Sequence, residues 1–147
     1  MKKCFSLDLR GSQMKENVKI TYLYRDGANW KNWGEVIFSN DEGLSVSEIE
    51  CRIRREIVEQ EVFVAHQIRI PELFPPPQDL SIHDHCYHEF DVAEITLEPA
   101  DDFWQRDISG FLSDLQKANK VGWDVFDIYC KCRPQASYMP KGGIISA

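Results

Sequence analysis

Three of the four histidines in the chain lie within six residues, between His83 and His88, in the run His-Asp-His-Cys-Tyr-His-Glu. Imidazole and carboxylate groups are common ligands of zinc and other transition metals. His83, His85 and His88 are therefore candidate metal ligands, with Asp84 or Glu89 as a supporting partner or general base. This pattern would suit a metal-binding protein or a metal-dependent hydrolase.

The spacing of these histidines matches no familiar metal motif, and a fourth ligand would have to come from elsewhere, with His66, Asp26 and Glu35 as candidates. The competing interpretation is a polar junction between a loop and a strand, whose side chains hydrogen-bond the backbone and cap the neighbouring hairpin. His66 lies on the apolar side of its segment, which favours a core histidine. A metal-independent enzyme would instead need Arg25, Asp26, His66 and Glu35 to converge in a cleft.

A second candidate site is the loop of a predicted hairpin in the segment 18–40. Trp30 and Trp33 stand there among hydrogen-bond donors and acceptors, and aromatic anchors with a polar rim carry much of the binding energy at protein interfaces. The alternative is that both tryptophans fold back over the core while Asn29 and Asn32 supply turn conformations. The residues of this candidate binding site are Arg25, Asp26, Asn29, Trp30, Lys31, Asn32 and Trp33.

The charge balance and composition exclude several classes of function. The formal net charge of −7 argues against nucleic acid as a partner, because phosphates would be repelled, and favours a basic protein. No segment has the ~20 apolar residues of a membrane span, and Asp8 and Arg10 interrupt any signal peptide. Five cysteines with no disulfide framework agree with a cytoplasmic location, and the Cys130/Cys132 pair reads as two small apolar residues on a strand.

Hydrophobic periodicity predicts the elements that must position these residues. A helix should begin at the N-cap Ser45, and a second one should run from about Asp107 to the C′ residue Gly122. Alternating apolar residues predict strands on both sides of the hairpin loop and three more strands further along the chain. The predicted strands cover Val18 to Arg25, Glu35 to Ser39, Val62 to Ile70, Phe90 to Leu97 and Phe126 to Cys132.

The resulting order ββαββαβ predicts an α+β fold, a two-layer sandwich with one mixed or antiparallel sheet of about four to five strands and two helices on one face. A single domain should cover residues 18–132, preceded by a flexible leader at 1–17 and followed by a loose tail at 133–147.

Two motifs, Tyr-Arg-Asp-Gly-Ala-Asn-Trp-Lys-Asn-Trp-Gly-Glu and Asp-His-Cys-Tyr-His-Glu-Phe-Asp, resemble motifs of small uncharacterised bacterial proteins, over about residues 18–127. This resemblance implies a bacterial origin and a compact domain, and it assigns no activity to any residue. Phosphate-binding and nucleophile motifs such as a Walker loop or Gly-x-Ser-x-Gly are absent from the sequence. The sequence therefore favours a small acidic cytoplasmic protein-binding module, regulatory or accessory, over an enzyme, with no cofactor expected and zinc or another divalent metal as the alternative.

Overall fold

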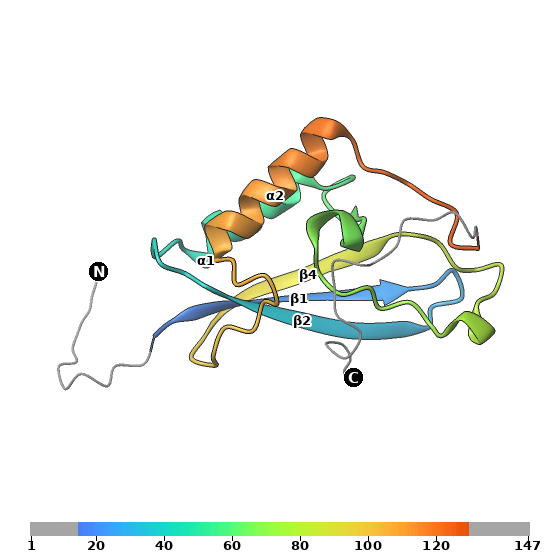
Figure 1. The fold of residues 1–147 in the computed structure, drawn as a ribbon, viewed down its shortest axis with the longest axis horizontal. Coiled ribbons are helices and arrows are strands. Elements are labelled where there is room, and N and C mark those ends of the chain that lie inside the picture. The colour runs from blue at the N-terminus through green and yellow to red at the C-terminus, as the bar shows by residue number, and fades with distance from the viewer. Residues whose placement is uncertain (1–14, 130–147) are drawn as a thin grey trace.

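The structure is a computed structural model, and it describes residues 15–129. These residues form a four-stranded antiparallel sheet and two α-helices, which confirms the predicted α+β class (Figure 1). The strands lie in the order β2-β1-β4-β3, so one strand of the predicted hairpin, β2, lies at the edge of the sheet and the other, β1, lies in its interior. The elements are β1 (Asn17–Arg25), β2 (Lys31–Ser39), α1 (Val46–Glu56), β3 (Val62–Phe63), the 3-10 helices η2 (Ala65–Ile68) and η3 (Pro77–Asp79), β4 (His88–Thr96) and α2 (Ile108–Val121).

The alternation of side chains along β1 gives the sheet two different faces. Val18, Ile20 and Tyr22 are buried on one face, which we call the covered face, and both helices lie over it (Figure 1). The opposite face, which we call the outer face, carries Lys19 and Thr21. Most of the hydrophobic core therefore lies between the covered face and the helices.

Both helices begin where the sequence predicts, and α2 also ends at the predicted Gly122. The Ser45 hydroxyl accepts a hydrogen bond from the Glu48 N–H at 3.1 Å, and the Asp107 carboxylate accepts one from the Gly110 N–H at 3.1 Å. Gly122, at φ 110°, closes α2 by donating its N–H to the Ala118 carbonyl at 2.9 Å.

The predicted strand from Val62 to Ile70 is wrong beyond Phe63. Ala65 starts a 3-10 turn, and Arg69 then adopts a left-handed conformation at φ 61°. Residues three apart lie on the same side of a 3-10 turn, so Ala65 and Ile68 are both buried without any strand. The alternating pattern therefore predicts the burial of Val64, Ile68 and Ile70 correctly, but not that of Ala65, and the backbone conformation that it predicts is wrong.

The predicted leader, last strand and tail lie wholly or partly outside residues 15–129. Only residues 15–17 of the predicted leader are described, and the predicted tail at 133–147 lies outside, as do Cys130 and Cys132 of the predicted last strand. Residues 126–129 are not in a strand, so the part of the predicted last strand that can be compared is wrong, and within residues 15–129 the order is ββαββα. Neither helix of this part of the chain has the length and apolar character needed to cross a lipid bilayer.

Candidate functional site

The loop between β1 and β2 is held in one conformation by its own side chains. Asp26 accepts hydrogen bonds from the backbone N–H groups of Ala28 at 2.9 Å and Trp30 at 2.8 Å. Asn29 takes the left-handed conformation at φ 74°, which asparagine tolerates better than most residues. Two residues that the sequence singles out therefore shape the loop.

An ion pair fastens this loop to the centre of the sheet. The Arg25 guanidinium donates to the Glu89 carboxylate on β4 at 2.8 and 3.2 Å, and its third contact is the Asn29 side-chain oxygen at 2.7 Å. The hydrogen bond to Glu89 raises the pKa of Arg25 above its ordinary value. A charged, two-pronged contact of this kind fixes orientation as well as distance.

Trp30 and Trp33 are half exposed, with 46% and 53% of their surface open to solvent. Trp30 contacts the edge of the Tyr24 ring at a centroid distance of 6.4 Å, whereas Trp33 lies on the outer face, paired with Leu23 of β1. About half of each tryptophan surface therefore faces solvent, so the alternative in which both side chains fold back over the core does not account for the exposed half. Between them Lys31 and Asn32 are exposed, and the Asn32 side chain donates to the Leu73 carbonyl at 3.1 Å.

The histidine segment lies directly behind this loop and braces it. The His83 carbonyl accepts a hydrogen bond from the Gly27 N–H at 2.8 Å, and a Cβ at position 27 would lie only 3.3 Å from that oxygen. The His85 ring places Nε2 at 2.8 Å from the Arg25 carbonyl and accepts from the Tyr87 N–H through Nδ1 at 3.1 Å. The structure thus joins the two candidate sites of the sequence into one.

His88 is completely buried beneath the same region. Its Nε2 accepts a hydrogen bond from the Leu73 N–H at 2.8 Å, so this nitrogen carries no proton. Burial, and next the proximity of His85, lower the pKa of His88 to about 3. Nearby, the Tyr24 hydroxyl donates a hydrogen bond to Asp84, and burial together with that bond raises the pKa of Tyr24.

These contacts bear on the predicted metal site. The ring nitrogens of His85 and Nε2 of His88 already bond backbone groups, while His83 is exposed. Asp84 bonds Tyr24, and Glu89 bonds Arg25. Within residues 15–129 no group of three or more His, Cys, Asp or Glu side chains is placed to hold a metal ion. The geometry favours the predicted polar junction, and the metal site stays a prediction without structural support.

The residues of the metal-independent alternative do not meet in a cleft. His66 belongs to η2, on the covered side, and its ring contacts Phe126 at a centroid distance of 5.4 Å. Glu35 lies on the outer face, opposite Thr21 of β1. Arg25 and Asp26 are committed to the loop contacts described above.

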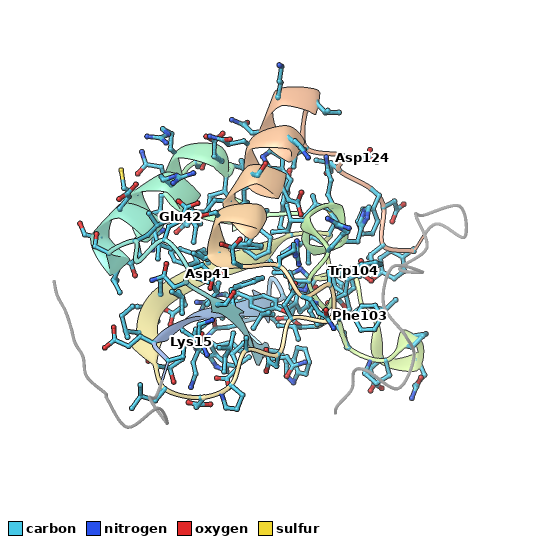
Figure 2. All side chains as sticks on the ribbon, turned by 60° about the vertical axis from the view of Figure 1, so that its left-hand side comes forward. Lys15, Asp41, Glu42, Phe103, Trp104 and Asp124 are labelled. Atoms are coloured by element: carbon cyan, nitrogen blue, oxygen red, sulfur yellow. The ribbon has the colours of Figure 1, made fainter. Side chains whose placement is uncertain are left out.

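Two features of this region were not found from the sequence. The first is the edge of β2, part of which is covered by the segment 97–107: Asp101 bonds the backbone N–H and carbonyl of Ile37 at 2.8 and 2.9 Å. The second is Phe103 in that segment, 51% exposed beside Trp104 (Figure 2). The sequence does contain a signal for Phe103, because Phe103 and Trp104 form an aromatic pair within an acidic run. It contains none for the covered edge of β2, because that depends on strand order, which hydrophobic periodicity does not report.

No protein-family model, no curated protein and no solved structure matches this chain.

Proposed function

We propose that the chain is a small acidic protein-binding module of bacterial, cytoplasmic type, regulatory or accessory in role, which recognises a basic partner through the hairpin loop and the adjoining outer face. The observation that carries this proposal is that two half-exposed tryptophans stand close together in the chain, Trp30 on a loop fixed by side-chain hydrogen bonds and Trp33 on the adjoining strand β2, where the sequence predicts that the loop continues. A preorganised loop loses little conformational entropy on binding, and tryptophan is among the residues most enriched at binding hot spots.

The chemistry around the tryptophans supports a protein partner. Arg25, Asn29, Lys31 and Asn32 form a polar rim, as interfaces between soluble proteins commonly have. Charge also defines the partner, because residues 15–129 contain 23 acidic and 11 basic side chains. Such a body attracts positively charged proteins and repels phosphate backbones.

A peptide-display selection tests the proposal. Random peptides are selected on the wild-type chain and counted against a variant carrying Trp30→Ala and Trp33→Ala. We expect enriched sequences that are rich in Lys and Arg, and at least a tenfold loss of their binding to the variant, since hot-spot truncations cost about 2 kcal/mol or more. Binding should also weaken as salt is raised.

A matched control removes exposed apolar surface elsewhere. Val121 is 83% exposed and is the last residue of α2, which lies over the covered face, so Val121→Ala should leave peptide binding unchanged. Circular dichroism must show that the tryptophan variant is folded. A variant that unfolds would show that the tryptophans belong to the core, and a folded variant with undiminished peptide binding would equally contradict the proposal.

A further inference from the structure

Within residues 15–129, the edge of the sheet next to the tryptophans is open over three residues of β2. β2 is the outermost strand on its side, paired only with β1 among residues 15–129. Ile37 directs its backbone N–H and carbonyl away from β1, because both bond Asp101. Residues two apart along a strand point their backbone groups the same way, so Lys31, Trp33 and Glu35 also direct theirs outward.

The open section has defined limits. On one side Asp101 occupies the edge at Ile37, and Asp107 forms a bridge at Ser39. On the other side the chain leaves the sheet at Lys31 and turns back into the hairpin loop. Unpaired edges of this kind are sites at which another strand can add.

We propose that the open edge of β2 binds the same edge of a second copy of this chain, in antiparallel register about Trp33. This register is the one that pairs all three open positions of each copy: Trp33 faces Trp33, and Lys31 faces Glu35 in both directions. All three side chains lie on the outer face, so each Lys31 meets a Glu35 across the new pair of strands. The edge is thus complementary to itself, as a two-fold interface requires.

The Lys31 and Glu35 side chains are accessible for this pairing. Lys31 is exposed and makes no ion pair within residues 15–129, while Glu35 has only a 3.7 Å contact with Lys19, and its side chain is 50% exposed. Both groups are therefore available to a partner. The negative charge of the body opposes self-association at long range, but salt screens that repulsion over about 10 Å at 0.1 M, whereas groups in direct contact are screened much less.

This inference deepens the proposed function and rests on it for the view that this surface binds protein. Strand addition uses backbone groups at the edge and leaves the outer face open. A dimer would join two binding surfaces into one, with the Trp33 side chains side by side at its centre. The basic partner could then bind across both copies.

Sedimentation velocity over a range of concentrations, on the purified full chain, tests the inference through charge exchange. Wild type should show a concentration-dependent dimer. Lys31→Glu and Glu35→Lys should each weaken it about tenfold or more, because each replaces two attractive cross-strand pairs by two repulsive ones. The double variant with both changes should regain the wild-type constant, and a mixture of the two single variants should form a heterodimer.

Two variants control for net charge. Glu42→Lys alters the charge as Glu35→Lys does but lies in the turn before α1 (Figure 2), and Lys117→Glu matches Lys31→Glu from the exposed side of α2. Both should keep the dimer. A wild-type chain that stays monomeric, or single variants no weaker than these controls, or a double variant that fails to recover, would overturn the inference. If the wild-type chain is a monomer but still selects basic peptides through Trp30 and Trp33, the dimer inference is wrong and the proposed function stands.

Discussion

His88 should lower the free energy of unfolding in mild acid, because its buried side chain resists protonation in the folded protein. The side chain is 0% exposed, packed against the rings of Phe74 and Tyr24 at centroid distances of 4.8 and 5.4 Å. Protonation of Nε2 would set a second donor against the Leu73 N–H and place a charge in the core. These effects account for a pKa lowered from 6.5 to about 3.

The sign of the pH dependence follows from proton uptake by the unfolded chain. In the unfolded chain His88 binds a proton as the pH falls below 6.5, whereas the folded protein does not bind one until the pH approaches 3. Acid therefore stabilises the unfolded state throughout this window, by an amount that approaches about 1.4 kcal/mol per pH unit once the pH is well below 6.5. Between pH 6.5 and 4.5 His88 alone should lower the free energy of unfolding by about 2 kcal/mol, and above about pH 8 it should add no pH dependence.

Urea denaturation followed by circular dichroism at several pH values would measure this effect. His88→Gln keeps an acceptor for the Leu73 N–H, and His88→Phe removes it at a cost of about 1–3 kcal/mol at neutral pH. Both variants should lose less stability than wild type between pH 6.5 and 4.5, by about 2 kcal/mol. His83→Gln, which removes an exposed histidine, should follow the wild-type curve. Parallel curves for wild type and the His88 variants would refute the reasoning.

Other substitutions test how the covered face and the edge segment are built. Gly34→Ala should destabilise by about 1–3 kcal/mol, because its Cβ would lie 3.0 Å from both methyl carbons of Leu73, and Leu73→Ala should relieve most of that penalty in a double-mutant cycle measured by denaturation. Gly110→Ala should instead be neutral or stabilising by up to about 1 kcal/mol, since its Cβ meets only ordinary contacts, and a clear loss of stability would contradict this. The Arg106 side chain is 8% exposed and donates to Asp102 at 2.9 Å, so Arg106→Met should cost about 3–5 kcal/mol and Arg106→Lys less; equal losses would show that the planar set of donors, which lysine lacks, and not the charge, is what matters.

The main elements could be predicted because each has a pattern that only one backbone conformation satisfies. The alternation from Val18 to Tyr24 specifies a strand with one buried face. The N-cap Ser45 marks the first helix, and in both helices apolar residues recur every three or four positions. The segment after Phe63 could not be predicted in this way. Its apolar residues, Val64, Ala65, Ile68 and Ile70, are buried, and a buried 3-10 turn satisfies an apolar pattern as well as a strand does.

The candidate site was found in part. Its residues belong to segments that the sequence singles out, but their pairing is not local: Arg25 and Glu89 lie 64 positions apart, and their contact depends on β4 lying beside β1. Periodicity gives the face of a residue and not its neighbour on the next strand. The same limit hid the open edge of β2, because the position of β2 at the end of the sheet follows from strand order alone.

Because residues 83–88, the histidine segment, contact the loop between β1 and β2, mutations in this segment can affect the loop as well as any metal site. His85 bonds the Arg25 carbonyl, and the His83 carbonyl bonds Gly27, so this segment holds the loop that carries Trp30. His85→Ala would free the loop and weaken binding of a partner even if no metal is ever bound. Loss of function in such a variant is therefore no evidence for a metal site, and metal content must be measured directly on untagged protein. A metal-free wild type, with peptide binding reduced by His85→Ala and kept by His83→Ala, is the result expected if these residues serve the loop, because the His83 contact uses its backbone carbonyl.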